Sequence, residues 1–254
     1  MAIDSCTGVD FWVRFVQWDW TKNLSTCYVE RVSTRHRACV GKRTPFLLTT
    51  SLVTDSFNFE KATQILNVIA QNAGGTINKM KAIKIAFFAD RYHIRKFGRT
   101  ISGDKLVAMK HGPVGSGSRD LLEKNGNHGR AQACEYADEF IESVEDHRFY
   151  YRSIQDVDES VLSESELEAI KFAWEKFGSL KEFDLANLTH QYPEWKKYEK
   201  FLKNSNTGKY DIAEEDMFDD PPIYFDPCFK LSSEEREIRR QYFQERQRIE
   251  ALWR

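Results

Sequence analysis

The segment from Thr76 to Phe97 constrains the fold most, because apolar side chains cover nearly the whole circumference of the helix that it predicts. One seam of that helix comprises Met80, Ile83, Phe87, Ile94 and Phe97. The opposite side carries Ile85, Ala89 and Tyr92. A helix that is apolar on all sides is buried in the middle of a domain. We therefore predict a central helix that begins at Thr76 or Asn78 and stops at Gly98.

The segments around this helix predict a mainly α (α+β) fold. A first helix follows Asn58, which can cap it, and ends at Gly74-Gly75. Later helices are expected over residues 119–124, 132–144, 163–177, 181–189 and 194–202. Residues 105–111 and 147–154 alternate like strands and could pair with each other; Gly112-Pro113 breaks the first of them. We expect a compact helical domain with a small antiparallel β-sheet or hairpin and flanking tails.

Four segments make up the expected domain organisation. Residues 57–205 form the helical domain, residues 206–230 an acidic linker that contains prolines, and residues 231–254 a charged helix capped by Ser232 and Glu235. Residues 1–56 form an N-terminal extension without a sustained helical period, and two interpretations of it stay open. It is either a segment that binds something, or a stretch that is disordered or precedes the true start, for example at Val53.

The formal net charge of −2 conceals an asymmetry along the chain. Residues 57–130 contain 13 Lys and Arg against 5 Asp and Glu, a net charge of +8, whereas residues 131–254 contain 17 against 29, a net charge of −12. Either region could be a docking surface, because charge steers association more than it shapes a fold. The sequence shows no uncharged apolar run of about 18 residues and no secretory signal, so we expect no membrane span and a cytoplasmic location.

The densest group of motifs lies between residues 79 and 122. It comprises Lys84-Ile-Ala-Phe-Phe-Ala-Asp-Arg-Tyr-His93, Phe97-Gly-Arg99, Ile101-Ser-Gly-Asp104, Gly112-Pro-Val114 and the paired Leu121-Leu122. Two further motifs follow at Leu162–Ala169 and Leu188–Trp195. In this order and spacing they resemble the Panacea (SocA-like) antitoxin domain over about residues 57–202.

The resemblance implies an antitoxin of a toxin–antitoxin system, one that neutralises a cognate toxin encoded by an adjacent gene by binding it directly. A protease that receives the toxin is a further candidate partner. Domains of this family serve toxins of unrelated folds, so the motifs do not identify the toxin. The alternative is a phage-associated or other mobile-element regulator that binds nucleic acid through a basic helix face.

That basic face is the candidate partner-binding site. Its residues lie on one stripe of the central helix, with an aromatic side chain among the cations, and are Lys81, Lys84, Phe88, Arg91 and Arg95. Such a stripe fits an acidic protein or a nucleic acid, but it is also what the solvated flank of a core helix looks like. Both interpretations stay open at this point.

Asp90 is the residue whose position demands an explanation, because it lies in the apolar seam. A carboxylate there is costly unless it is hydrogen-bonded or paired. We expect it to anchor a neighbouring loop through backbone N–H groups or an arginine such as Arg99. The catalytic alternative pairs it with His93 or His111 as an acid/base or metal site, but we expect His93 on the helix surface.

No catalytic residue, metal or cofactor is expected, and the chain is predicted not to be an enzyme. The spacing of Cys6, Cys27 and Cys39 with His36 lacks the paired ligands of structural zinc. Residues 115–118 precede a helix and could bind an anion, although they do not form a phosphate-binding P-loop. A structural role is assigned to Asp90, His93, Gly98, Arg99, Gly103, Asp104, Gly112, Pro113 and Trp195.

Overall fold

The computed structural model describes residues 13–19, 24–30, 57–124, 131–204, 208–221 and 231–252. The chain divides into two units, Met1–Leu52 and Val53–Arg254. In the smaller unit, β1 (Val13–Asp19) and β2 (Leu24–Glu30) pair antiparallel. Of the residues considered for zinc, Cys27 lies in β2, whereas Cys6, His36 and Cys39 lie outside the described residues.

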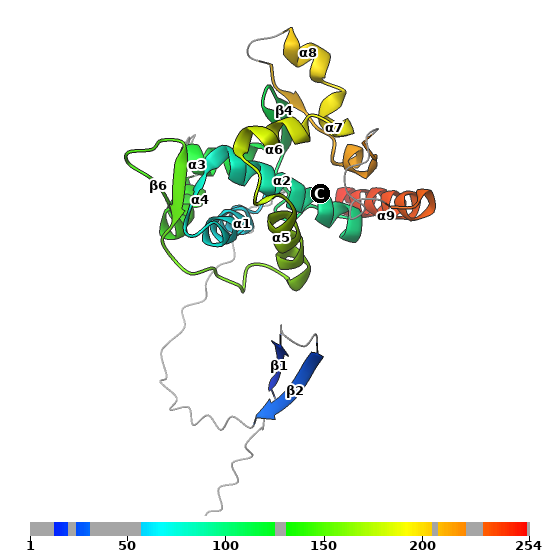
Figure 1. Ribbon diagram of the computed structural model, residues 1–254. Coiled ribbons are helices and arrows are strands. Elements are labelled where there is room, and N and C mark those ends of the chain that lie inside the picture. The colour runs from blue at the N-terminus through cyan, green and yellow to red at the C-terminus, as the bar shows by residue number, and fades with distance from the viewer. Residues whose placement is uncertain are drawn as a thin grey trace, which may run out of the picture. The chain divides into compact units, whose positions relative to one another are not determined.

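The larger unit is built around α2 (Lys79–Phe97), as the all-round apolar pattern predicts. Figure 1 shows α2 in the middle of this unit, where it packs against α1 (Phe59–Asn72), α5 (Glu164–Phe177) and α6 (Glu182–Thr189). Its residues from Ala82 to Ala89 are all buried. Phe88 stacks on Phe177 with 4.0 Å between ring centroids. Tyr192 contacts the Phe88 ring in an edge-to-face arrangement. The fold is mainly α with a small β component, which confirms the expected class.

The helix ends follow their local sequence signals. Asn58 accepts a hydrogen bond from Lys61 N at 2.8 Å and caps α1. Asn78 caps α2, and Gly98 ends it in the left-handed conformation with φ of +74°. Thr76, the other predicted start, belongs instead to the short strand β3 (Thr76–Asn78). Capping signals therefore locate the helix ends to within a residue or two, because they act between near neighbours.

Two three-stranded antiparallel sheets replace the single predicted pair of strands. The first has the order β3-β7-β6, with β6 (Ile141–Ser143) and β7 (Tyr150–Ser153). The second has the order β5-β4-β8, with β4 (Leu106–Met109), β5 (Gly112–Gly115) and β8 (Tyr210–Asp211). The predicted pairing of residues 105–111 with 147–154 is wrong, since these segments lie in different sheets. Gly112-Pro113 follows β4 after a tight turn and opens β5, so the second sheet continues through it.

Short helices complete the domain around these sheets. They are α3 (Ser116–Glu123), α4 (Ala131–Phe140), α7 (Pro193–Lys196) and α8 (Glu199–Lys203). The helix predicted over 132–144 stops at Phe140, where β6 begins. None of the helices in the described ranges is long and apolar enough to cross a membrane.

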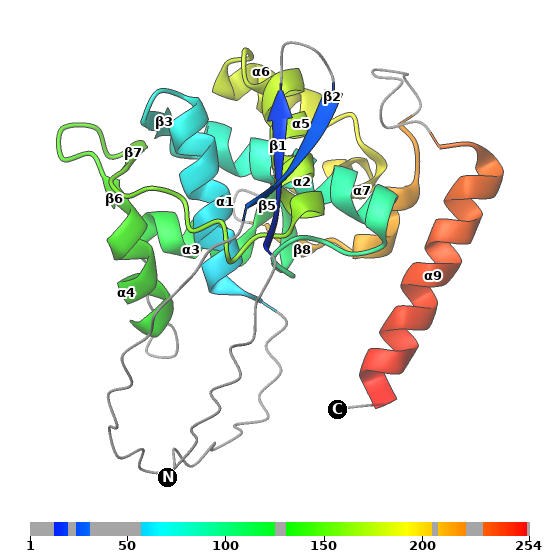
Figure 2. The same cartoon turned by 90° about the horizontal axis from the view of Figure 1, so that it is seen from below.

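The described part of the predicted acidic linker, residues 208–221, belongs to the domain. Besides β8 it forms the 3₁₀ helix η1 (Glu214–Phe218), whose Met217 and Phe218 have no exposed surface. These side chains join the same core as α2. The last helix, α9 (Ser233–Leu252), begins with the predicted Ser232–Glu235 cap and packs against η1 through Phe243. Figure 2 shows α9 at the edge of the unit. Acidic composition alone does not reveal the two buried apolar residues at the centre of this segment.

Gly112 is the position where the backbone can least accept a side chain. Its φ is +100°, and a Cβ there would lie 2.3 Å from Thr189 Oγ1 and 2.9 Å from Lys84 Nζ. Gly74 also has a positive φ, of +81°, but no atom lies within 4 Å of its Cβ position. An alanine at Gly74 would therefore introduce backbone strain alone, whereas an alanine at Gly112 would introduce backbone strain and steric overlap.

We predict that Gly112→Ala destabilises the protein more than Gly74→Ala. The control variant Gly74→Ala should lower the free energy of unfolding by about 1 kcal/mol, because its backbone is left-handed. Gly112→Ala should lower it by roughly 1–3 kcal/mol more, because the new methyl group overpacks against α6 and α2. Urea unfolding of both variants measures the difference. Equal losses would show that the hairpin can move away from α6 at little cost.

Candidate functional site

Lys84, the first residue of the central motif, is buried and holds the β4–β5 hairpin onto α2. Its exposed fraction is 1%, and its Nζ donates a hydrogen bond to Pro113 O at 2.7 Å. Burial lowers the pKa of this ammonium group to about 7. Gly112 lets the backbone pass close to this side chain, as the 2.9 Å separation from Nζ to the Cβ position shows. Lys84 is therefore a structural residue rather than a surface cation.

The late motif at residues 188–195 packs on the same hairpin. Trp195 Nε1 donates to Met109 O at 2.8 Å, and the Trp195 ring stacks on His190 with 3.8 Å between centroids. Burial, with the nearby charge of Lys84, lowers the pKa of His190 to about 4, so its ring is neutral at pH 7. The structure thus brings together Lys84, Gly112, Pro113 and Trp195, which lie far apart in the sequence.

Asp90 anchors the corner that follows α2, as predicted. Its Oδ1 accepts a hydrogen bond from Ile101 N at 2.8 Å, and 5% of the residue is exposed. Burial raises the pKa of this carboxyl group to about 7, although the Ile101 N–H opposes the shift. Arg99, the other predicted partner, turns to Glu166 instead. Asp90 thus holds the corner onto α2 through the backbone N–H group of Ile101.

Asp104 at the end of the same corner caps α3. Its two carboxylate oxygens accept hydrogen bonds from Gly117 N, Ser118 N and Ser118 Oγ, each at 2.7 Å. A Cβ on Gly115 would lie 2.4 Å from Asp104 Oδ2. The backbone N–H groups proposed to bind an anion in residues 115–118 are therefore engaged by a carboxylate of the chain itself. Gly103, with φ of +65°, makes the turn that brings Asp104 there.

His93 is buried, which corrects its predicted place on the helix surface. It has no exposed surface, its Nδ1 lies 2.7 Å from Arg99 O, and its Nε2 lies 3.1 Å from Ser165 Oγ. Burial lowers its pKa. His93 and Asp90 thus hold different parts of one corner, while His111 is exposed at the hairpin turn. The acid/base pairing considered for Asp90 with His93 or His111 is not formed.

Glu166 forms ion pairs with two cations near this corner, Lys61 and Arg99. Its side chain is fully buried and accepts from Lys61 Nζ at 2.6 Å, Arg99 Nη1 at 2.5 Å and Ser163 N at 2.9 Å. Burial opposes its ionisation, but these three donors outweigh that effect and lower its pKa to about 2. Glu166 is also the N3 residue in the capping box of α5, a local pattern that does not reveal its contacts with α1 and the corner.

The predicted basic surface stripe is wrong, because most of it lies inside the domain. Phe88 and Arg91 have no exposed surface, and Arg95 is 3% exposed. Lys84 is buried as described, and Lys81, which is partly exposed, donates to Gly178 O at 2.6 Å. These side chains are buried because other segments, among them α5, α6 and η1, pack around α2. A stripe that resembles a solvated flank when one helix is considered alone is covered by the β4–β5 hairpin and by segments that come much later in the sequence.

The two arginines of the stripe bind the C-terminal part of the chain. Arg91 Nη1 pairs with Glu194 Oε1 at 2.6 Å, with both side chains fully buried, and Arg91 Nη2 donates to Asp219 O at 2.7 Å. Arg95 donates to Phe218 O at 2.6 Å and pairs with Asp220 at 2.5 Å. The acidic residues that neutralise these arginines were not singled out from the sequence. In the sequence, Glu194 lies in the motif at residues 188–195, and Asp219 and Asp220 lie in the acidic segment 206–230, but neither pattern identifies their arginine partners.

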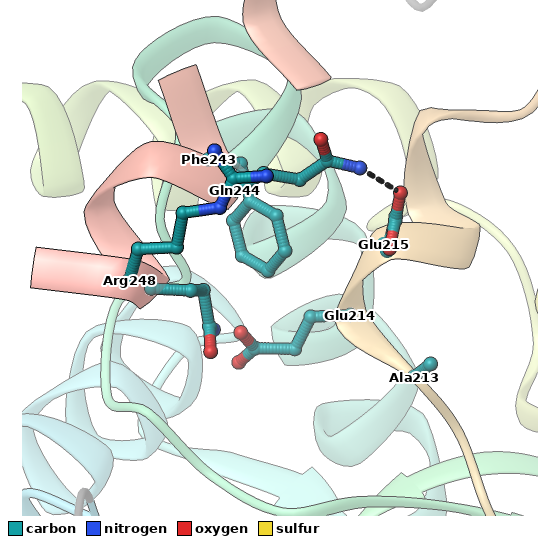
Figure 3. A pocket seen from close by; sticks show the side chains of 7 residues that line it. Ala213, Glu214, Glu215, Phe243, Gln244 and Arg248 are labelled. Carbon is teal, nitrogen blue, oxygen red and sulfur yellow. Dashed lines mark hydrogen bonds between the residues drawn. The ribbon is translucent and has the colours of Figure 1, made fainter. Parts of the chain in front are cut away.

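A pocket of about 490 Å³ opens between η1 and α9 (Figure 3). Its walls carry Glu214, Glu215, Gln244, Gln247 and Arg248, together with Ala213 and Phe243. Glu215 accepts from Gln244 Nε2 at 2.7 Å, and Glu214 accepts from Thr100 Oγ1 at 3.0 Å. The lining contains no Ser, Thr, Cys or His, and we assign no reaction to it. Within the described ranges, no three or more His, Cys, Asp or Glu side chains gather into a metal site.

We predict that the Arg91–Glu194 pair is strongly coupled. Arg91→Met or Glu194→Leu alone should cost about 3–5 kcal/mol, because each leaves a buried charge without its partner. The double variant should cost far less than the sum, because both charges are then removed. A double-mutant cycle from urea unfolding measures this coupling. Additive losses would contradict it.

We also predict a specific pH dependence from Asp90. The pKa rises from 3.8 to about 7 on folding, so between these values the unfolded chain releases a proton that the folded chain keeps. The contribution of Asp90 to stability therefore falls as pH rises from about 4 to 7 and is constant above. Asp90→Asn cannot ionise and still offers an acceptor to Ile101 N.

The stability of Asp90→Asn relative to wild type should accordingly rise by about 2 kcal/mol between pH 5 and pH 7.5. Urea unfolding at a series of pH values measures it, with Asp146→Asn at an exposed position as the matched control. A difference that does not change with pH would show that Asp90 is ionised in the folded protein throughout.

Comparison with known proteins gives one match. Residues 83–196, which extend from α2 to α7, match the family model described as "Antitoxin SocA-like, Panacea domain". Comparisons with curated proteins and with solved structures found no match. The matched range contains Lys84, Asp90 and His93, which hold the hairpin and the corner onto α2, as well as Asp104, which caps α3, and Trp195, which bonds to β4. The resemblance predicted from the motifs is thus confirmed over residues 83–196, where the chain is similar to the antitoxin SocA-like Panacea domain.

Proposed function

We propose that this protein is an antitoxin that neutralises a cognate toxin by direct protein–protein binding. The observation that carries the proposal is the match of residues 83–196 to the antitoxin SocA-like Panacea domain. The toxin is the product of an adjacent gene, and both proteins act in the cytoplasm. The action is stoichiometric binding rather than catalysis.

The use of the motif residues supports a binding role. Lys84, Asp90 and Asp104 bond to backbone groups of the chain itself, at Pro113, Ile101 and Gly117 respectively. Side chains engaged in this way define the shape of the domain and are not available to a substrate. The motif therefore fits a scaffold that presents surfaces to a partner.

The nucleic-acid alternative loses its main support. It depended on a basic face formed by Lys84, Arg91 and Arg95, and these side chains are buried and bonded within the domain. Binding to phosphates would require cations that reach the surface. We therefore do not carry it forward as a second function.

The test is a rescue experiment with the adjacent gene. Its product, expressed alone from an inducible promoter, should stop growth, and co-expression of this chain should restore it. The two proteins should co-purify in a fixed ratio. The toxin level should stay constant if the antitoxin masks the toxin, and fall if it delivers the toxin to a protease. A toxic neighbour that this chain neither binds nor neutralises would refute the proposal.

We predict that residues 57–254 rescue growth as well as the full chain does. The larger unit has its own core, and the family match lies wholly within it. The double variant Arg91→Met with Gly112→Ala, which should unfold, is the negative control. Rescue by the full chain but not by residues 57–254 would assign the N-terminal segment a role in binding.

A further inference from the structure

A group of exposed lysines lies at one end of the larger unit, where α7 and α8 pack beside β4 and β8 (Figure 1). Tyr210 of β8 stacks on Tyr198 with 5.4 Å between ring centroids and contacts Phe201 of α8 at 5.8 Å. Because β8 also pairs with β4, these contacts bring residues 195–204 and 208–211 together with residues 105–111.

The charge of these three stretches is strongly positive. They contain seven lysines against two carboxylates, an excess of five positive charges in a chain whose formal net charge is −2. All seven lysines are exposed. We call them the lysine patch, and they are Lys105, Lys110, Lys196, Lys197, Lys200, Lys203 and Lys209.

Carboxylates of the chain itself bind part of the lysine patch. Glu199 lies between two of its members, with Lys196 Nζ at 2.8 Å and Lys203 Nζ at 3.0 Å. Lys197 pairs with Asp216, which belongs to η1. The patch therefore already accepts carboxylates, one of them from a different element of the domain.

Three lysines of the patch have no such partner. Lys105 pairs with Asp211 at 2.8 Å. In contrast, Lys110, Lys200 and Lys209 form no ion pair with any residue in the described ranges. Counting the aspartate of η1 with the two carboxylates of the patch still leaves seven lysines against three carboxylates, an excess of four positive charges.

An exposed aromatic side chain lies among these lysines. Phe201 follows Lys200 on α8 and is 58% exposed. The rings of Tyr198 and Tyr210 stack on each other, so each covers one face of the other. Phe201 therefore offers open apolar area beside unpaired cations, a combination that fits a partner with both carboxylates and an apolar residue.

The surroundings of the lysine patch favour an acidic protein segment over nucleic acid as its occupant. Nucleic acid needs a track of cations along its backbone and open ring faces for its bases. η1 borders the patch through the Lys197–Asp216 pair and adds Glu214 and Glu215, which oppose a phosphate backbone that extends past the patch. A short acidic segment can stay within the positive area.

η1 itself is an example of such a segment within the chain. Its residues 214–218 are Glu-Glu-Asp-Met-Phe. Asp216 pairs with Lys197 of the patch, while the next two residues, Met217 and Phe218, are apolar and buried. A carboxylate directly followed by apolar residues is thus an arrangement that this part of the domain already binds.

We propose that the lysine patch, together with Phe201, is the docking site for an acidic segment of the toxin. The segment places carboxylates on Lys110, Lys200 and Lys209 and an apolar side chain on Phe201. The inference rests on the proposed antitoxin function and names the surface and the partner chemistry through which that function acts.

The experiment uses full-length protein, with the product of the adjacent gene as the probe. The patch variant is Lys110→Glu/Lys200→Glu/Lys209→Glu. Its control is Lys171→Glu/Lys176→Glu/Lys181→Glu, which makes the same change in net charge at exposed positions in α5 and at the start of α6. Because all six side chains are exposed, both variants should melt like wild type.

At low salt, the patch variant should associate with the probe at least about 10-fold more slowly than wild type, because opposite charges steer association. It should also restore growth less well. The control variant should stay within about 3-fold of the wild-type rate, because its charges lie away from the proposed contact. Equal slowing of both variants would show that net charge matters rather than this patch, and would overturn the docking site.

Salt and neutral substitutions test the charge of the occupant. Association of wild type should slow as salt rises, because salt screens the attraction. The variant Lys110→Gln/Lys200→Gln/Lys209→Gln, which adds no carboxylates, should associate at a rate between those of wild type and the patch variant. A wild-type rate that increases with salt would show that the probe presents a basic surface here, and would overturn the proposed occupant.

A further pair of variants tests the apolar contact. Phe201→Ser should release the probe about 10-fold faster than wild type, as loss of an aromatic anchor does. Phe149→Ser removes a side chain of 60% exposure next to β7 and should release the probe at the wild-type rate. Equal release by both variants would contradict the contact with Phe201.

The remaining outcomes separate this inference from the proposed function. If wild type neutralises the toxin and the patch variant does so equally well, the docking site is wrong and the antitoxin function stands. If wild type neither binds nor neutralises the probe, the function itself fails. A single-stranded oligonucleotide that binds wild type but not the patch variant at physiological salt would show that the patch binds nucleic acid, and would overturn the proposed occupant.

Discussion

The structure depends on one constraint: a helix buried on all sides can carry charged side chains only if every one of them is bonded within the domain. α2 carries Lys84, Asp90, Arg91 and Arg95 in buried positions. The energetic cost of leaving any of these unpaired exceeds what a typical hydrogen bond contributes. Each therefore acts as an attachment point for another segment of the chain, and the polar residues of one helix help to place the hairpin, the corner and η1.

This constraint also explains the uneven charge along the chain. The basic stretch 57–130 and the acidic stretch 131–254 are largely complementary parts of one domain. Lys61, Arg91, Arg95 and Arg99 all pair with carboxylates of the later stretch. The asymmetry first suggested two docking surfaces, but much of it is used in joining the two halves of the domain. Charge in sequence order is a poor guide to surface charge when oppositely charged segments fold onto each other.

The scaffold role of the motif residues follows from the same arrangement. The motif residues face inward and hold the hairpin, the corner and η1 in place, so they specify a shape more than a reaction. α9 is anchored to that shape by Arg236, Arg240 and Phe243 and leaves its other face uncovered.

The sequence by itself determined the features that arise between near neighbours. The periodicity of residues 76–97 predicted a central helix, Asn58, Asn78 and Gly98 located helix ends, and the apolar surroundings of Asp90 required a hydrogen-bonded carboxylate. The tertiary structure decided what depends on contacts between distant segments. It paired β4 with β5 and β8 rather than with β7, buried His93 and the basic stripe, and turned the acidic linker into part of the core. The physical reason is that periodicity and capping act over a few residues, whereas burial and ion pairing depend on which distant segment covers a given face.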